Sequence, residues 1–266
     1  MEPAVYSFVI LTFNSARYIQ QCLDSINQTA DVLKEPMEVF VVDNGSVDAT
    51  REIMQKIGFS QYVSFKSILF EENTGTTFSR NTALKQVSGE FIIVLDSDAY
   101  VNPLALDALK AYLEANKDCG LVVPRLTYLD GRHQLSVDQF PTLLHKIKRY
   151  FFLKKIEQQA PINKIRTVNY AISAFWMLPK KMLTEVGLLD EAIFYSPEDV
   201  DYCIRVWKAG YNISYLPEFS VVHDAQEISR PKGLKILNLF SLSHIKGLLY
   251  LYTKHRFIFS GKKFIH

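Results

Sequence analysis

The stretch FIIVLDSD at residues 91–98 decides which fold this sequence predicts. Its apolar run, Phe91–Leu95, is typical of a strand that is buried on both faces, as in a parallel sheet. The run leads to Asp96 and Asp98, and residues two apart in an extended segment point to the same side. Two carboxylates placed in this way can share one hard divalent cation, Mg²⁺ or Mn²⁺. A polar strand end that leads into a turn is the alternative interpretation.

Three more apolar runs precede this stretch, and helical patterns separate them. The expected strands are 5–12, 38–43, 63–70 and 91–96. The expected helices begin after Asn14 or Ser15, near Ser46 or Asp48, near Thr76, and at Pro103 after Asn102. This alternation predicts a βαβαβαβ unit, in which ligands bind beyond the carboxyl ends of parallel strands. The segments 12–14, 43–46 and 96–98 are therefore expected to meet at one edge of the sheet.

The second half of the chain carries a mixed pattern. The expected elements are extended segments at 121–129, 168–178 and 211–222, a turn at Asp130-Gly131, and helices at 180–186 and from 196 to before 210. Ser196 as the N-cap, Pro197 at the first helical position and Asp199 at the third would start the last helix without any catalytic role. The basic aromatic stretch at 146–155 predicts a mobile loop.

Length and composition limit the kind of protein. With 266 residues the chain is about the size of one large α/β domain, and 48% hydrophobic with 22% charged residues excludes disordered and fibrous classes. The net charge of +2 gives no reason to expect a nucleic-acid partner. Cys22, Cys119 and Cys203 lack the spacing of a zinc site or disulfide framework and are expected to be reduced thiols. Acidic Glu2 stands where a signal peptide carries positive charge, so a cytoplasmic chain is expected.

Polar residues near these strand and helix ends allow two interpretations each. Asp43 can bind a nucleoside, or it can belong to a turn at Asn44-Gly45. Asp199 can act as a general base, or it can help to cap a helix. His223 can bind a metal ion or a phosphate, or it can be a structural histidine. The residues alone leave these alternatives open.

Taken in order, these segments resemble the family 2 glycosyltransferases, which are inverting enzymes with a GT-A fold that use nucleotide sugars. The motifs that carry the resemblance are FVILTFN (8–14), VVDNGS (41–46), NTG (73–75), RN (80–81), LDSD (95–98), VGLLDE (186–191), EDVD (198–201), AGY (209–211) and VVH (221–223). They cover most of residues 5–223. The second half is most similar to the rhamnosyltransferase-like and galactofuranosyltransferase-like branches. The chain differs from the family at two positions, because Ser173 and Thr82 stand where the family often has Gly.

The resemblance implies an α/β fold of the GT-A type, with a mostly parallel central sheet flanked by helices and a C-terminal helical extension. It also implies a role for each residue that matches a motif. Nucleotide binding would fall to Thr12, Phe13, Asn14, Asp43, Asn73, Gly75, Arg80 and Ser97. Asp96, Asp98 and His223 would hold Mn²⁺ or Mg²⁺, Asp199 would be the catalytic base, and Glu198, Asp201 and Trp176 would bind or orient the acceptor.

The function implied by the resemblance is transfer of a sugar from a UDP- or dTDP-sugar to a hydroxyl of a glycan or lipid-linked acceptor, in cell-surface polysaccharide synthesis. A rhamnosyltransferase is the most similar branch. A haloacid-dehalogenase-like phosphatase is an alternative, since it also places D-x-D after a strand, but Tyr100 stands where it would need a Thr four residues after Asp96. A non-catalytic sugar-binding module is a second alternative, and it would be marked by a replaced metal or base residue.

The C-terminal segment has a composition of its own. We expect residues 1–229 to form the glycosyltransferase domain, with 1–100 as its nucleotide-binding half and 101–229 as its acceptor half, and 230–266 to form a helical extension. Residues 228–266 contain eight Lys or Arg and no Asp or Glu, and 234–259 is apolar on every helical face. The extension can dock on the domain, or it can lie peripherally on the inner face of a membrane. The sequence leaves the oligomeric state open.

Overall fold

The structure, a computed structural model, describes residues 3–142, 163–225 and 239–256. Its centre is a ten-stranded sheet with the strand order β3-β2-β1-β4-β11-β6-β12-β5, to which β7 and β9 are added by pairing with β6 and β12. The expected α/β architecture is therefore confirmed. A separate pair is formed by β8 (Val137–Asp138) and β10 (Tyr170–Ala171). The basic aromatic stretch at 146–155 lies outside the described residues.

The first half of the sheet is parallel, as the alternating pattern predicted. Its strands are β1 (Tyr6–Thr12), β2 (Met37–Asn44), β3 (Val63–Phe70) and β4 (Phe91–Asp96). The register places Thr12 opposite Asp43, and Leu11 opposite Asp96. All three strand ends therefore meet at one edge of the sheet.

The second half joins the first through an antiparallel strand. That strand, β11 (Phe175–Pro179), pairs with β4 so that Phe175 lies opposite Leu95. The remaining strands are β5 (Ala99–Tyr100), β6 (Cys119–Thr127), β7 (His133–Gln134), β9 (Arg166–Thr167) and β12 (Asn212–His223). β12 runs parallel to β6 and antiparallel to β5. The sheet is therefore mixed, with a parallel first half.

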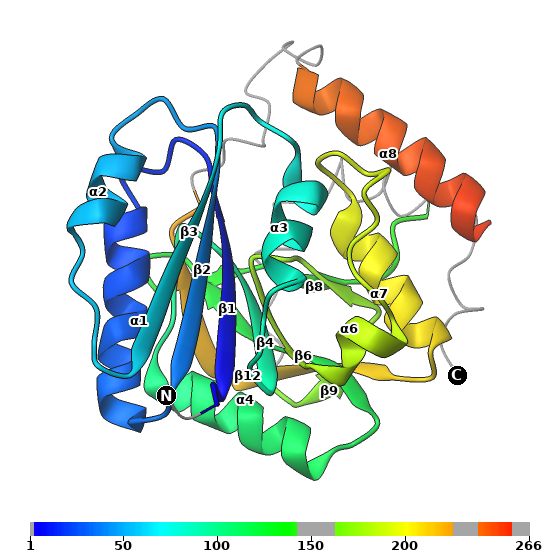
Figure 1. Cartoon of the computed structure of the whole chain (residues 1–266). Coiled ribbons are helices and arrows are strands. Elements are labelled where there is room, and N and C mark those ends of the chain that lie inside the picture. The colour runs from blue at the N-terminus through cyan, green and yellow to red at the C-terminus, as the bar shows by residue number, and fades with distance from the viewer. Residues whose placement is uncertain (1–2, 143–162, 226–238, 257–266) are drawn as a thin grey trace.

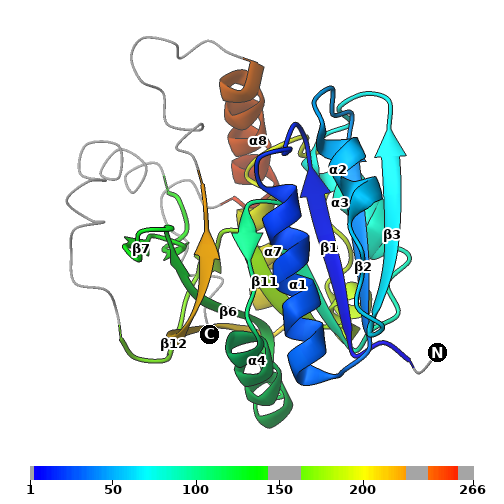
Figure 2. The same cartoon turned by 90° about the vertical axis from the view of Figure 1, so that its left-hand side faces the viewer.

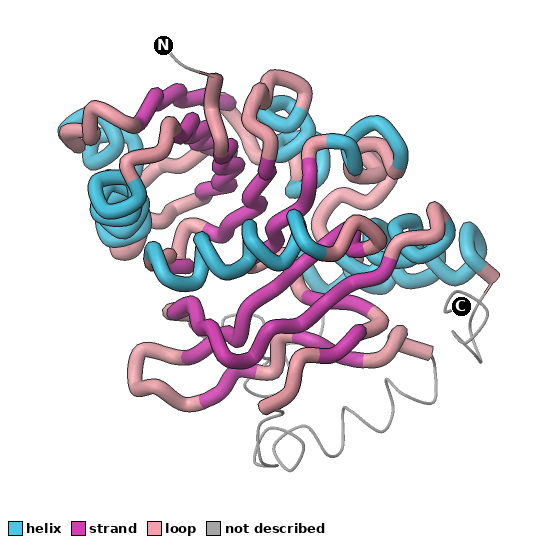
Figure 3. The backbone as a smooth tube through the Cα atoms, turned by 90° about the horizontal axis from the view of Figure 1, so that it is seen from below, coloured by secondary structure: helices cyan, strands magenta, loops and turns pink. Residues whose placement is uncertain are grey.

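Helices cover both faces of the sheet, and the alternation of side chains along the strands explains why. One face is covered by α1 (Ile19–Leu33), α2 (Thr50–Lys56) and α4 (Pro103–Ala115), and the other by α3 (Thr76–Leu84), α6 (Lys181–Glu185) and α7 (Glu198–Lys208). Phe8 and Ile10 pack in the first core, whereas Val9 between them packs in the second. Figure 2 shows α1 and α4 in front of the sheet, and Figure 3 shows helices on both sides of the strands.

Two helix starts differ from the prediction. α1 begins at Ile19 without a side-chain cap, because the Ser15 carbonyl accepts the Tyr18 and Ile19 amides in a preceding turn. α7 begins at Glu198, so the prediction of Ser196 as its N-cap was wrong. The Ser196 hydroxyl lies instead 3.0 Å from Nδ1 of His244. The start of α4 was correct, since Asn102 accepts a hydrogen bond from the amide of Ala105.

The C-terminal extension contains a helix that docks on the domain. This helix, α8 (Leu239–His255), lies beside α7 in Figure 1. Leu251 and His255 on it are buried, whereas Ile245 and Leu249 are exposed. Docking is therefore observed for α8, and membrane contact stays a prediction. Within the described part of the chain, no helix is both long and apolar enough to cross a bilayer.

Candidate functional site

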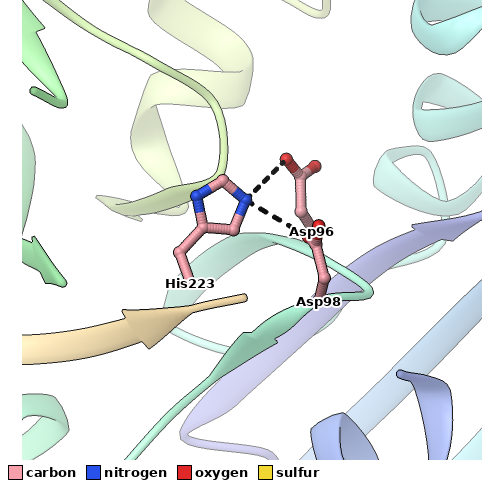
Figure 4. Close-up of side chains that lie close together, drawn as sticks. All are labelled: Asp96, Asp98 and His223. Carbon is pink, nitrogen blue, oxygen red and sulfur yellow. Dashed lines mark ion pairs between the residues drawn. The ribbon is translucent and has the colours of Figure 1, made fainter. Parts of the chain in front are cut away.

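Three of the predicted ligand residues form a cluster at the carboxyl edge of the sheet. Nε2 of His223 lies 3.2 Å from Oδ1 of Asp98 and 3.9 Å from Oδ2 of Asp96, as Figure 4 shows. One ligand atom from each residue lies within 4.8 Å of the other two. Two carboxylate oxygens and an imidazole nitrogen suit Mn²⁺ and are compatible with Mg²⁺. The donor set therefore fits the predicted divalent cation.

The pairing of β5 explains how residues so far apart in sequence come together. The chain reverses after Asp96, and β5 pairs antiparallel with the end of β12, so that Ala99 lies opposite His223. Asp98 directly precedes Ala99, which brings its carboxylate beside the imidazole. The amide of Asp224 also donates a hydrogen bond of 2.8 Å to the carbonyl of Asp98. The cluster is thus built on backbone hydrogen bonds of the sheet.

Gln134 orients the imidazole of His223, although no sequence motif indicated this role. Its Oε1 lies 2.8 Å from Nδ1 of His223, and both side chains are buried. An amide oxygen only accepts, so Nδ1 carries a proton that points to Gln134, and Nε2 faces the two carboxylates. Burial lowers the pKa of His223, but the hydrogen bond and charge of Asp98 outweigh it and raise the pKa overall. The raised pKa favours a second proton on Nε2, beside Asp98. A cation at the cluster would take the place of this Nε2 proton.

Arg80 connects the cluster of Asp96, Asp98 and His223 to the acidic start of α7. Its guanidinium, only 2% exposed, lies 2.5 Å from Oδ1 of Asp96, 2.8 Å from Oγ of Ser173 and 3.4 Å from Oε1 of Glu198. The Ser173 hydroxyl donates to the same Glu198 oxygen at 3.0 Å. Ser173, where the family often has Gly, therefore links Arg80 to Glu198.

Burial shifts the pKa values of the carboxyl groups around Arg80. It raises the pKa of Asp96, which Arg80 counteracts and Asp98 reinforces. Burial and the neighbouring charge of Asp199 raise the pKa of Glu198 to about 8, against the opposing effect of Arg80. Glu198 is therefore mostly protonated at neutral pH in this arrangement, and Arg80 is free to balance Asp96.

The predicted nucleoside contacts Thr12 and Asp43 lie side by side at the ends of β1 and β2. Asp43 is fully buried, and its Oδ1 accepts hydrogen bonds from the Ser46 amide at 3.1 Å and from Nε of Arg51 at 2.7 Å. Its Oδ2 and the hydroxyl of Thr12, its partner in the sheet register, are buried without hydrogen-bond partners. Buried polar groups without partners are costly. The pair is therefore suited to polar groups of a ligand.

Two loops beside this pair carry the other predicted nucleotide contacts. In the first, Asn14 has a positive φ of 51°, accepts a hydrogen bond from the Val47 amide at 2.9 Å, and follows Phe13, which is 42% exposed. Ser97 is close by, since its hydroxyl donates to that of Ser15 at 2.9 Å. The first loop thus joins the ends of β1, β2 and β4.

The second loop is held by backbone geometry. Asn73 accepts hydrogen bonds from the side chain of Asn44 and from the amide of Gly75, both at 3.0 Å. Gly75 has a φ of +87°, and a Cβ there would lie 2.5 Å from the carbonyl oxygen of Phe194. Only glycine fits this position without strain. The amide of Thr76 donates to the same carbonyl at 2.6 Å, which ties the loop to the segment before α7.

Asp199 lies at the first turn of α7, half-buried, and its Oδ1 accepts a hydrogen bond from the Val200 amide at 2.8 Å. Tyr195, three residues before Glu198, is affected by the charges of both acidic groups. Burial and the charges of Asp96, Glu198 and Asp199 raise the pKa of the Tyr195 hydroxyl. The charge of Arg80 opposes this increase. No motif in the sequence marked Tyr195.

Two of the predicted acceptor residues point elsewhere. Trp176 is 1% exposed, donates a hydrogen bond of 3.1 Å to the carbonyl of Ala171 and stacks on Tyr202, so it belongs to the core and we do not keep it in the site. Asp201 is fully buried, and its carboxylate is paired with Arg205, Lys254 and His255 at 2.6–2.8 Å. In this structure Asp201 therefore holds α8, and a contact with the acceptor stays a prediction.

A cavity of about 270 Å³ lies at the opposite edge of the sheet. Phe91 at the start of β4 and Cys119 at the start of β6 line it, together with Lys117, Lys180 and Lys181. None of the predicted site residues lines this cavity, so it does not belong to the candidate site.

Comparison with known proteins places the chain in a family. The family model described as Glycosyl transferase family 2 matches residues 7–187, more than half of the chain. The poly(ribitol-phosphate) beta-N-acetylglucosaminyltransferase TarS of Staphylococcus aureus is 34% identical over 128 residues, which are 48% of this chain and 22% of that protein. The uncharacterized glycosyltransferase MJ1057 of Methanocaldococcus jannaschii is 26% identical over 253 residues, 91% of this chain and 79% of that protein. The stretch matched in sequence is thus only about a fifth of the length of TarS.

Solved structures support the fold. The crystal structure of S. aureus TarS 1-349 in complex with UDP has a TM-score of 0.59 at 24% identity and covers 82% of this chain and 59% of that chain. The structure of GalNAc-T7 with UDP, GalNAc and Mn²⁺ has a TM-score of 0.69 at 15% identity and covers 95% of this chain and 48% of that one. These likenesses confirm the expected GT-A fold.

Proposed function

The chain belongs to glycosyl transferase family 2, and from this premise we propose that it is a metal-dependent, inverting glycosyltransferase. It transfers a sugar from a UDP- or dTDP-sugar to a hydroxyl of a glycan or lipid-linked acceptor. One observation carries the proposal: the cluster Asp96–Asp98–His223 and the unpaired polar atoms of Thr12 and Asp43 lie at the same edge of the sheet. A nucleoside diphosphate needs both kinds of site side by side.

The nucleoside would bind across the ends of β1 and β2. Oδ2 of Asp43 accepts a hydrogen bond from a base N–H, and the Thr12 hydroxyl pairs with a carbonyl or ribose oxygen. Arg51 holds the carboxylate in place through its other oxygen. Phe13 and Asn14 border the base, while Asn73, Gly75 and Ser97 border the rest of the nucleotide. The TarS complex with UDP supports a uridine nucleotide for this fold, and dTDP is the second candidate.

Asp96, Asp98 and His223 would hold Mn²⁺ or Mg²⁺. When bound, the cation supplies Lewis-acid stabilisation of the negative charge that develops on the leaving diphosphate. Gln134 keeps Nε2 of His223 available for this role, and Arg80 compensates part of the charge on Asp96. Mn²⁺ in the structure of GalNAc-T7 supports a divalent cation.

Asp199 would take the proton of the acceptor hydroxyl. A carboxylate in this position can accept that proton as the hydroxyl attacks. Attack from the face opposite to the leaving diphosphate breaks the anomeric C–O bond in one displacement and inverts the configuration. Glu198, protonated at neutral pH, adds no second negative charge beside Asp199.

The acceptor is proposed from the resemblance and from a relative. TarS is named for transfer to poly(ribitol-phosphate), a polymer that offers hydroxyl groups. We propose a hydroxyl-bearing glycan or lipid-linked glycan of the cell surface as the acceptor, and a rhamnosyl or other hexosyl residue as the transferred sugar. Residues 1–229 would form the catalytic domain at the cytoplasmic side.

The two alternative functions have less support. The family match does not support a haloacid-dehalogenase-like phosphatase. A non-catalytic sugar-binding module would be marked by a replaced metal or base residue, and none of the proposed ones is replaced.

A ligand screen tests the proposal. UDP, dTDP and their sugars are added with Mn²⁺, and the melting temperature is measured. A ligand at 100 times its dissociation constant stabilises by about 2.7 kcal/mol, which corresponds to about 5–10 °C for a chain of this size. EDTA should remove most of that shift. Equal stabilisation with and without the metal, or a product that retains the anomeric configuration of the donor, would contradict the proposal.

The extension would also contact the membrane surface. Ile245 and Leu249 lie one helical turn apart on α8 and are 48% and 63% exposed, and the segment 228–266 is purely basic in its charged residues. We expect full-length protein to sediment with anionic liposomes more than with neutral ones. Replacing both residues by Glu should reduce this binding, and equal sedimentation of the variant and the parent would refute the contact.

A further inference from the structure

The segment 190–201 is in contact with the helix α8 at its start, in its middle and at its end. This segment contains Glu198 and Asp199, and it leads into α7. At its start, Oδ2 of Asp190 lies 2.8 Å from the hydroxyl of Tyr250 and 2.6 Å from Nζ of Lys254. At its end, Oδ1 of Asp201 lies 2.6 Å from the same Nζ. One lysine of α8 thus bridges the two ends of the segment that carries the proposed base.

Gly247 makes the contact in the middle. A Cβ at this position would overlap the carbonyl oxygen of Ser196 and lie 2.9 Å from Cδ of Pro197. The helix backbone therefore lies directly against the backbone of Ser196, two residues before Glu198. On the same side, Nδ1 of His244 lies 3.0 Å from the Ser196 hydroxyl. A close approach of this kind requires glycine and transmits any shift of the helix to the loop.

The charges of this contact are compensated inside the protein. Asp201 is fully buried and accepts hydrogen bonds from Arg205 at 2.8 Å and from Nε2 of His255 at 2.8 Å, besides Lys254. Burial alone would raise the pKa of Asp201, but the hydrogen bond of His255 and the charges of Arg205 and Lys254 hold it well below its usual range. The carboxylate stays ionised, so the attachment of α8 persists at neutral pH.

The other side of the segment is attached to the nucleotide half. The Phe194 carbonyl accepts the Thr76 amide at 2.6 Å, and the Ile193 carbonyl accepts the hydroxyl of Thr77 at 2.6 Å. The segment therefore lies between α3 and α8. If α8 moves, the segment is held from one side only, and the carboxylate of Asp199 loses its fixed place relative to Asp96 and Asp98.

We propose that α8 is a positioning element of the active site, and that Gly247 and Lys254 are its positioning residues. They set the place of the segment 190–201, and with it the place of the proposed base. The inference rests on the proposed function, because it assigns Asp199 its role. It predicts that disturbing α8 impairs transfer and leaves nucleotide binding intact, since Thr12, Asp43 and the metal cluster have no contact with α8 among the interactions of the described residues.

The first test is Gly247→Ala in the full chain. The new methyl group must displace α8 or the loop, and a misplacement of about 1 Å at a reacting group costs up to about 100-fold in rate. We expect kcat to fall by about 10-fold or more, while the affinity for UDP with Mn²⁺ changes by less than about two-fold. Alanine is the better helix former, so a helix without a positioning role would leave kcat unchanged. Thr253→Ala, on the exposed side of α8, is the control and should match the parent protein.

The second test covers the case that Gly247→Ala does not fold. Lys254→Met removes the bridge between Asp190 and Asp201, and Lys254→Arg restores a cation. We expect Lys254→Met to lower kcat without weakening UDP binding. Lys254→Arg should keep a kcat much closer to that of the parent protein. The matched control is Lys246→Met, an exposed lysine of the same helix. Unchanged turnover of Lys254→Met, or a parallel loss of UDP affinity, would overturn the proposal. A parent protein that neither binds UDP nor transfers sugar would instead contradict the proposed function.

Discussion

Replacing Gln134 by Leu tests whether the cluster of Asp96, Asp98 and His223 binds a metal ion. The substitution removes the acceptor 2.8 Å from Nδ1 of His223 and preserves much of the side-chain volume. Loss of such a partner costs about 10- to 100-fold in metal affinity, or about 1.4–2.7 kcal/mol. Gln134 and His223 are only 8% and 7% exposed, so water replaces the lost acceptor poorly. We therefore expect a loss in the upper half of that range.

Mn²⁺ binding is measured by the electron paramagnetic resonance signal of the free ion, with and without UDP. Gln139→Leu is the matched control, because it makes the same change at an exposed position five residues away. Gln134→Glu keeps an acceptor for Nδ1 and should bind Mn²⁺ nearly as well as the parent protein. Normal Mn²⁺ affinity in Gln134→Leu would refute the reasoning, and so would an equal loss in the Gln139→Leu control.

The remaining predictions concern the carboxylates of the site. Asp98→Ala should abolish the effect of EDTA on UDP affinity while the melting temperature shows a folded protein, and a persisting effect would remove Asp98 from the metal site. Asp199→Asn should lower turnover by about 100- to 10,000-fold with UDP affinity unchanged, and near-normal turnover would exclude it as the base. Glu198 has a pKa of about 8 in the folded protein, above its ordinary value of 4.5, so it binds a proton that the unfolded chain loses. Metal-free protein should therefore lose stability in urea between about pH 5 and pH 8, and Glu198→Gln should flatten this loss. An identical pH slope in both proteins would contradict the raised pKa.

The local pattern of the sequence predicted the first half of the fold well. The strands β3 and β4 begin and end where expected, and α3 and α4 begin at Thr76 and Pro103 as predicted. Hydrophobic period, turn residues and caps are properties of neighbouring residues, and they are visible without a structure. The strand pattern also predicted that Thr12, Asp43 and Asp96 lie at one edge of the sheet, because parallel strands end on the same side.

Helix starts in less regular segments were harder to predict. Ser196 has the right residue type for an N-cap, but its hydroxyl faces His244 on α8, 48 residues later. Asp201 looked like a residue for the acceptor, and its carboxylate holds the same helix. In both cases the side chain bonds to α8, which is distant in the sequence. The preference of a residue type for a local position gives no information about such a partner.

Residue patterns alone were enough to predict the alternating strands and helices of the first half, the types of the candidate metal ligands and the family of the chain. Only the tertiary structure decided that Gln134 orients His223, that Arg80 joins Asp96 to Glu198, and that α8 holds the segment of the proposed base. These contacts span from 16 to 118 residues along the chain. They depend on strand register and on the antiparallel pairing of β5 with β12. The same local sequence pattern is compatible with other registers and pairings, so the pattern alone does not specify these contacts.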